Sequence, residues 1–292
     1  MKCICCLSNK IILLHSGPAG CYSCERCGLI FRENIEEDDY FGRVKHHYQK
    51  TDPHEQVAES KLKFFRSALD YLSSQFEKEC RRILDVGCGY GYFLELAQKR
   101  GWQVWGIEIM SGGARVAKKK LGTNSIFNGR LTEACYPRSS FDAITLWDVL
   151  FVVDDPFKEL KECYRILKNG GAIGIRVRNA FFQKIIYRAH LHSHKIASRL
   201  SIKNPAVFHR YCYSSQSIYN LLQRIGFRHI KIINSPLTAG DPYGHASSRL
   251  TQAAKRMIYL TSRLIFGMSD GRWVVGPSLL IWAEKPTSNI KP

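Results

Sequence analysis

The sequence lacks the long apolar runs that form membrane-spanning helices. Its longest apolar run, residues 273–283, is far shorter than the roughly 20 residues such a helix needs, and Gly276 and Pro277 interrupt it. This run predicts a late β-strand. The apolar core of a secretory signal is also missing, because residues 11–14 are too short to form one. We therefore expect a cytoplasmic protein, and 292 residues with 45% hydrophobic content can bury a substantial core.

Acidic residues are missing from a long part of the chain. None occurs from residue 163 to residue 240. Residues 163–292 contain 20 Lys and Arg against 3 Asp and Glu, whereas residues 1–162 contain 23 against 22. The carboxyl-terminal half should therefore attract an anionic partner, and nucleic acid, anionic lipid and phosphorylated metabolites all fit. A solvated basic surface with no partner is the alternative.

A glycine-rich turn follows a predicted buried strand. Residues 83–91 read Ile-Leu-Asp-Val-Gly-Cys-Gly-Tyr-Gly, and a helical pattern that Gly101 closes comes next. Glycines at alternating positions let the backbone bend sharply and approach a ligand, while the helix start presents free N–H groups. A second strand, residues 103–107, precedes Glu108, where a doubly wound fold places an acid that accepts hydrogen bonds from ribose. The turn therefore predicts a nucleotide-like ligand.

The order of the acid and the glycines narrows the choice of ligand. The pattern is D-x-G-x-G-x-G and not the G-x-G-x-x-G of dinucleotide enzymes, and an acid before the turn suits a cationic ligand. Residues 82–109 resemble the first motif of class I S-adenosylmethionine-dependent methyltransferases. Residues 141–150 resemble their fourth strand and its loop, and residues 160–177 resemble the helix, glycine turn and fifth strand that follow. A glycine turn that serves packing alone is the alternative.

The resemblance covers residues 82–234 and 278–284. It implies an α/β, Rossmann-like fold with a doubly wound, mostly parallel seven-stranded sheet, and S-adenosylmethionine as the cofactor. Gly87 and Gly89 would line its methionine part, and Glu108 would hold its ribose. Asp85 would act through the turn's backbone or a water. The cofactor residues implied by the resemblance are Asp85, Gly87, Cys88, Gly89, Gly91, Glu108, Ile109, Gly129, Leu131 and Asp148.

The adenine and acceptor sides of this site depart from the family pattern. The acid often found after the third strand is missing, so backbone amides of residues 128–131 and the Leu131 side chain are expected to contact adenine. Asp148 would reach toward the cofactor's amino group or the acceptor. Members commonly have Glu-His where this chain has Phe151 and Val152, which puts ordinary acid-base assistance in doubt and favours a more apolar acceptor site.

His209 is the candidate general base, with Asp148 as the second catalytic candidate. The segment 209–214 resembles a His-aromatic segment that, in the family, precedes a helix on the acceptor side, here residues 217–225. A structural histidine is the alternative. His190, His192 and His194 do not predict a metal site, because no helical spacing brings all three together.

Cysteines are concentrated at the amino terminus. Two C-x-x-C pairs separated by 17 residues are typical of a zinc ribbon that binds one tetrahedral ion, and they predict the ligands Cys3, Cys6, Cys24 and Cys27. Cys5 and Cys21 are possible substitutes. A disulfide framework is the alternative, although a chain without an export signal belongs in a reducing compartment. Some bacterial methyltransferases of small or sugar-linked substrates carry such a ribbon, which adds to the resemblance.

We therefore predict a zinc ribbon at residues 1–35, a linker and helix at 36–80, and a methyltransferase domain at 81–292. Basic helical insertions are expected at about 179–207 and 240–270. Their apolar stripes are suited to a membrane interface, to docking on their own domain, or to forming a wall of the acceptor pocket.

These patterns favour methylation of a small, sugar-linked or lipid-linked acceptor at oxygen, with peripheral contact to the inner membrane surface. The first alternative is an RNA methyltransferase whose ribbon and basic half bind phosphates. It ranks lower, because the chain contains no Asn/Asp-Pro-Pro-aromatic motif. The second alternative is a scaffold protein that binds the cofactor without turnover.

Overall fold

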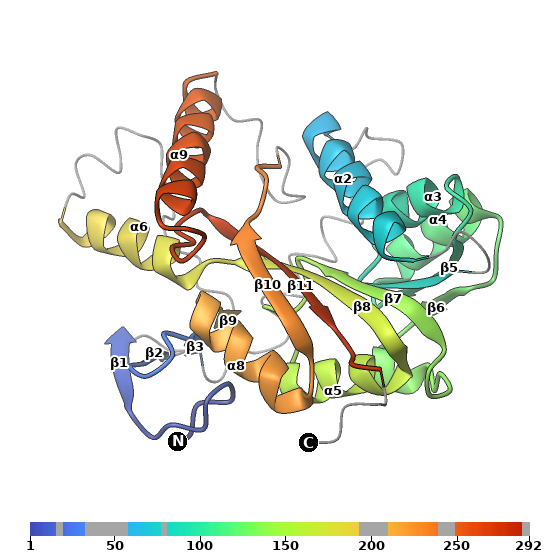
Figure 1. The fold of residues 1–292 in the computed structure, drawn as a ribbon, viewed down its shortest axis with the longest axis horizontal. Coiled ribbons are helices and arrows are strands. Elements are labelled where there is room, and N and C mark those ends of the chain that lie inside the picture. The colour runs from blue at the N-terminus through green and yellow to red at the C-terminus, as the bar shows by residue number, and fades with distance from the viewer. Residues whose placement is uncertain (16–19, 33–57, 77–80, 193–209, 239–248, 288–292) are drawn as a thin grey trace.

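The computed structural model describes residues 1–15, 20–32, 58–76, 81–192, 210–238 and 249–287. Its main element is a seven-stranded sheet with the order β10-β11-β8-β7-β4-β5-β6 (Figure 1). β4, β5, β6, β7 and β8 run parallel, and β11 is antiparallel to both of its neighbours. The predicted doubly wound, mostly parallel seven-stranded sheet is therefore confirmed. The strands are β4 (Arg82–Val86), β5 (Gln103–Glu108), β6 (Ile126–Asn128), β7 (Phe141–Trp147), β8 (Leu167–Arg178), β10 (Arg228–Asn234) and β11 (Ser278–Glu284).

Helices cover both faces of this sheet, and each face has its own hydrophobic core. α2 (Glu59–Gln75), α3 (Tyr92–Gln98) and α4 (Ser111–Leu121) pack on one face, while α5 (Pro156–Ile166) and α8 (Ser215–Ile225) pack on the other. Local signals fix the helix ends. The Asp155 side chain caps α5 with Pro156 in its first turn, Ser214 caps α8, and Gly226 ends α8 in a left-handed conformation.

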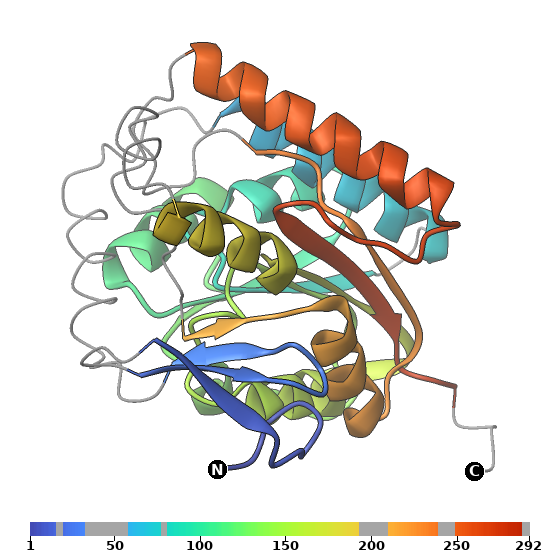
Figure 2. The same ribbon diagram turned by 90° about the vertical axis from the view of Figure 1, so that its left-hand side faces the viewer.

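The amino-terminal ribbon is joined to the rest of the protein by a four-stranded sheet. β1 (Ile11–His15), β2 (Cys21–Cys24) and β3 (Ile30–Arg32) are antiparallel, and β9 (Tyr211–Cys212) pairs with β3 as a fourth strand. Figure 2 shows β9 alongside the ribbon strands. The Arg224 guanidinium donates to the Ile4 and Cys5 carbonyls, and the Ser214 hydroxyl donates to the Cys27 carbonyl. The ribbon therefore lies firmly against α8.

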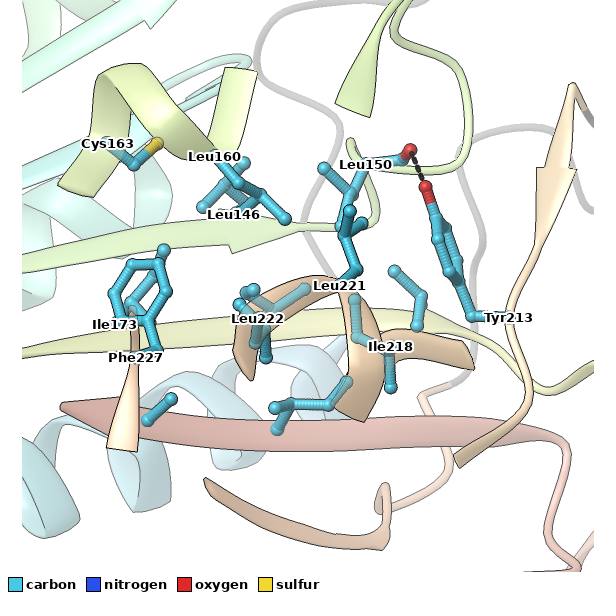
Figure 3. Close-up of a cluster of buried hydrophobic side chains, with 14 of the residues drawn as sticks. Leu146, Leu150, Leu160, Cys163, Ile173, Tyr213, Ile218, Leu221, Leu222 and Phe227 are labelled. Atoms are coloured by element: carbon cyan, nitrogen blue, oxygen red, sulfur yellow. Dashed lines mark hydrogen bonds between the residues drawn. The ribbon is translucent and has the colours of Figure 1, made fainter. Parts of the chain in front are cut away.

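The core beneath the ribbon also holds the loop after β7. Leu146, Leu150 and Leu160 pack against Ile218 and against Leu221 and Leu222 of α8 (Figure 3). The buried Tyr213 hydroxyl donates to the Leu150 carbonyl over 3.1 Å. The loop that begins at Asp148 is thus held by residues far away in the sequence.

The two basic insertions are partly described, as α6 (Ala180–His192) and α9 (Arg249–Met268). In α6, Phe181 and Ile185 of the predicted apolar stripe are exposed, whereas Gln183 is buried. The Lys184 ammonium donates to the Ser23 hydroxyl over 2.9 Å, so this basic residue contacts the ribbon. Within the described ranges, no helix is long and apolar enough to cross a membrane.

Candidate active site at the carboxyl edge of the parallel sheet

The glycine turn after β4 has the backbone that the sequence predicted. Gly87, Gly89 and Gly91 have φ values of 74°, 55° and 76°, a region that side chains rarely adopt. A Cβ atom on Gly87 would lie 2.3 Å from Cγ2 of Val149, in the loop after β7. The turn is also tied to β5, because the amides of Gly87 and Cys88 donate to the Ile107 carbonyl. The turn therefore brings the ends of β4, β5 and β7 together.

Glu108 is buried at the end of β5 and faces this turn. One carboxylate oxygen accepts the Gly89 N–H over 2.8 Å, and the other accepts the Met110 N–H over 2.8 Å. Burial raises the pKa of Glu108, while these two backbone donors act in the opposite direction. Each oxygen keeps a further lone pair, so Glu108 can also accept hydrogen bonds from ribose hydroxyls.

We expect Glu108→Ala to weaken cofactor binding by about 1.5 to 3 kcal/mol, the range for hydrogen bonds to a charged group. Calorimetric titration with S-adenosylhomocysteine measures this change. Glu95→Ala is a suitable control, because Glu95 forms an exposed ion pair with Lys99 on α3. Equal affinity in Glu108→Ala and in the control would contradict the role of Glu108.

Asp85 lies at the end of β4 and is almost completely buried. Its Oδ1 accepts the Thr145 hydroxyl over 2.7 Å. Burial raises the pKa of Asp85 to about 7, with the Thr145 hydrogen bond and the Lys61 charge opposing this. A carboxyl group at this position, beside a turn that is predicted to bind a cationic ligand, could supply negative charge when the ligand binds.

The raised pKa of Asp85 predicts a pH dependence of stability. The folded protein holds the Asp85 proton up to about pH 7, whereas the unfolded chain releases it near pH 4. The free energy of unfolding should therefore fall, as pH rises from 5 to 7, by about 2 to 3 kcal/mol more in the wild type than in Asp85→Asn. Urea unfolding of both proteins across this range measures the difference, and identical slopes would contradict the prediction.

Asp148 follows β7 and has a left-handed backbone, with φ of 62°. Its Oδ2 accepts from Nη1 of Arg176 over 2.9 Å, and its own N–H donates to the Arg176 carbonyl. Nη2 of Arg176 donates to the Thr238 hydroxyl over 2.8 Å. The guanidinium also lies 5.1 Å from the Phe64 ring centroid. Asp148 therefore stands at the sheet edge as one half of an ion pair.

Arg176 is a candidate site residue that the sequence reasoning missed. It lies on β8 between Ile175 and Val177, and its side chain is buried. Its Nε is buried with no hydrogen-bond partner within the described residues. A charged residue between two apolar residues of a strand is the signal that could have found it, because a buried charge requires a partner.

The structure puts the remaining predicted cofactor residues near the same edge but in different settings. Leu131, on a short 3-10 helix (Leu131–Glu133), is buried in the core. The Gly129 amide donates to the Glu108 carbonyl, and the Arg130 amide donates to the Glu133 carboxylate. Ile109 is exposed, which leaves its side chain available to a flat ring. Cys88 is buried, and burial raises its pKa.

His209, the candidate base, lies outside the described residues. The neighbouring Tyr211 N–H donates to the Phe151 carbonyl over 3.1 Å. The Phe151 side chain is buried in the core that the ribbon and α8 share. Phe151 therefore packs the loop after β7 against the ribbon.

Four thiols of the ribbon meet in one cluster. The sulfur atoms of Cys3, Cys6, Cys24 and Cys27 all lie within 4.8 Å of one another. Sγ of Cys3 is 3.5 Å from that of Cys27, and Sγ of Cys6 is 3.6 Å from that of Cys24. Four sulfurs around a tetrahedral zinc at about 2.3 Å would be about 3.8 Å apart, so the set fits the ion.

The two substitutes that the sequence left open lie outside this cluster. Neither Cys5 nor Cys21 is a member of it, whereas Cys3, Cys6, Cys24 and Cys27 are. The described cysteines, including all six of the ribbon, are free thiols. The geometry therefore favours a metal site over a disulfide framework.

Comparison with known proteins agrees with this geometry. A family model described as a methyltransferase domain matches residues 54–232. The chain is similar to the ubiquinone biosynthesis O-methyltransferase of Xanthomonas oryzae pv. oryzae, with 33% identity over 116 residues, 38% of this chain and 48% of that protein. The protein of the same description from Alkalilimnicola ehrlichii is 35% identical over 102 residues, 32% of this chain and 40% of that protein. The chain spans about half the length or less of these curated relatives.

Solved structures show the same fold at low sequence identity. A chain of the complex between the Haloferax volcanii Trm112 methyltransferase activator and a methyltransferase superposes with a TM-score of 0.55 and 15% identity, covering 88% of this chain and 100% of that one. An S-adenosylmethionine-dependent methyltransferase from Listeria monocytogenes superposes with a TM-score of 0.50 and 15% identity. This match covers 76% of this chain and 97% of that one. With the glycine turn and the acids that end β4 and β5, the family match shows that this chain belongs to the methyltransferase-domain family.

Proposed function

We propose that this protein is an S-adenosylmethionine-dependent methyltransferase that methylates an oxygen atom of a small, sugar-linked or lipid-linked acceptor. The observation that carries the proposal is the Asp148–Arg176 pair, which fixes one carboxylate oxygen of Asp148 and leaves the other without a hydrogen bond within the described residues. Val149, the next residue, touches the position of a Gly87 Cβ, so this carboxylate stands beside the cofactor turn. The curated relatives named O-methyltransferases support oxygen as the acceptor atom.

In this proposal the residues of the site divide between binding and orientation. S-Adenosylmethionine, when bound, supplies the electrophilic methyl group. Glu108 holds the ribose, and the glycine turn lets the backbone approach the methionine part. The free Asp148 oxygen accepts a hydrogen bond from the acceptor hydroxyl or from the cofactor's amino group. Arg176 is a positioning residue for Asp148, and His209 remains the candidate that removes the acceptor proton.

We also propose that the ribbon binds one structural zinc ion through Cys3, Cys6, Cys24 and Cys27. Four protein ligands leave no open coordination position, so this ion would serve folding and not chemistry. The free thiols of the ribbon support a reducing compartment, and we propose the cytoplasm, with a lipid-linked acceptor met at the inner membrane surface.

The proposal is tested by incubating the protein and labelled S-adenosylmethionine with separate metabolite, lipid and RNA fractions. We expect label to enter the lipid or the metabolite fraction, in a bond that marks an O-methyl group by mass spectrometry. Asp148→Asn should lose this transfer while it still binds S-adenosylhomocysteine. Label that enters RNA alone would replace the proposal with the RNA alternative, and cofactor binding without transfer to any fraction would favour the scaffold alternative.

A further inference from the structure

The helix α9 carries an apolar stripe on its outer side. Met257, Leu260, Leu264 and Met268 follow one another at spacings of three and four residues, which places them on one face of the helix. Their exposed fractions are 63%, 49%, 65% and 79%. In both ribbon views α9 lies at the outer edge of the molecule (Figures 1 and 2). The sequence leaves open whether this apolar face packs on its own domain. In the structure the face is exposed.

The opposite side of α9 is the one that anchors it. Ser262 is buried, and its carbonyl accepts from Nδ2 of Asn234, at the end of β10, over 3.0 Å. Asn234 also accepts the Gly276 N–H, which links α9 to the segment that leads into β11. These polar contacts and the packing of Phe266 against the core hold the helix in place, and within the described residues none of these contacts uses the stripe.

The size of the apolar surface exceeds what isolated exposed residues provide. Trp273, just after α9, is 65% exposed, and Ile258 is also exposed. A single exposed leucine needs no explanation, but a continuous row of large apolar side chains marks an interaction site. An exposed tryptophan close in sequence to such a row is typical of helices that lie in a membrane interface.

Charge decides which partner the stripe fits. Arg256 and Arg263 are exposed and seven residues apart, so they line one flank of the stripe, and α9 contains no acidic residue. A nucleic acid would use these cations but gain nothing from the four apolar side chains. A second copy of the chain would bring the same arginines together and repel. An anionic bilayer surface can bind both the arginines and the apolar side chains.

We propose that α9 docks the enzyme on an anionic lipid surface, with the row Met257, Leu260, Leu264 and Met268 in the interface and Arg256 and Arg263 at the phosphates. This inference rests on the proposed function, because a lipid-linked acceptor is reached at the surface of a membrane. α9 is anchored at the end of β10, and Thr238, four residues later, binds Arg176. The docking helix and the Asp148–Arg176 pair therefore lie at the same end of the sheet.

The test measures binding of the full chain to phosphatidylcholine vesicles with and without phosphatidylglycerol. We expect the wild type to cosediment with the anionic vesicles and less so as salt is raised. Met257→Ser with Leu264→Ser, and separately Arg256→Glu with Arg263→Glu, should each weaken this binding at least about tenfold. Leu13→Ser is the matched control, because Leu13 is a leucine of 54% exposure on the ribbon, and it should leave the binding unchanged.

Trp273 provides an independent signal. Of the five tryptophans, Trp102, Trp147 and Trp282 are buried and Trp105 is partly buried, so Trp273 is the one that vesicles can reach directly. Its fluorescence should shift to the blue when anionic vesicles are added, and Trp273→Phe should lose that shift.

Several results would overturn the inference. The inference is wrong if the wild type does not bind anionic vesicles. It is also wrong if neither double substitution weakens the binding. A dimer that Met257→Ser with Leu264→Ser converts to a monomer would identify the stripe as a self-association surface, and a drop in its thermal midpoint would identify it as core. Calorimetry with S-adenosylhomocysteine separates these failures from failure of the proposed function. A wild type that binds vesicles but methylates no lipid would refute the lipid-linked acceptor alone.

Discussion

Gly87→Val is expected to abolish cofactor binding, with at least about a 100-fold loss of affinity, or about 2.7 kcal/mol. Gly87 has φ of 74°, and its Cβ would lie 2.3 Å from Cγ2 of Val149. The new side chain therefore has to displace the loop that carries Asp148, in addition to crowding the methionine part of the ligand. Isothermal titration with S-adenosylhomocysteine measures the loss.

Gly101→Val is the matched control, because Gly101 has φ of 81° and no atom within 4 Å of its Cβ position. It carries the same backbone strain, about 1 to 3 kcal/mol of stability, and should keep its cofactor affinity. Adding Val149→Ala to Gly87→Val separates two causes. Restored binding would assign the effect to the Val149 contact, and continued loss would assign it to the ligand. Normal binding in Gly87→Val, or tight binding of a nicotinamide dinucleotide by the wild type, would refute the assignment.

Cys24→Ser is expected to release the metal and loosen the ribbon. We expect elemental analysis to find one zinc per wild-type chain and none in the variant, because three thiolates hold zinc much more weakly than four. The loss should also lower the thermal midpoint of the whole protein. β3 of the ribbon pairs with β9, and the Cys27 carbonyl accepts the Ser214 hydroxyl at the start of α8. Cofactor affinity should change much less, since the glycine turn follows β4 of the seven-stranded sheet and the ribbon strands belong to the separate four-stranded sheet.

Cys21→Ser is the control for this prediction. Cys21 is buried on β2 but lies outside the four-sulfur cluster, so the variant should be destabilised and still hold one zinc. Zinc retained in Cys24→Ser but lost in Cys21→Ser would show that the ligand set is different. A wild type without zinc, purified under reducing conditions, would refute the metal site itself.

Local sequence signals determined the strands, the glycine turn and the cysteine cluster of this protein. Glycines at 87, 89 and 91 predict a left-handed backbone because other residues rarely adopt it, and all three adopt it here. Each C-x-x-C pair predicts half of a metal site, because its spacing lets two sulfur atoms of one turn bind the same ion. Glu108 was predicted from its place after a short apolar strand. Each of these signals is contained in a few neighbouring residues.

The tertiary structure alone decided three further features. Arg176 pairs with Asp148 across 28 positions of sequence, β9 completes the ribbon sheet, and the stripe of α9 faces outward although the same pattern could have been packed inside. The periodicity of apolar residues predicts which side chains share one face of a helix, but it does not predict what that face packs against. Partners of this kind depend on strand order and on how distant segments pack, and neither is encoded in the residues of one segment.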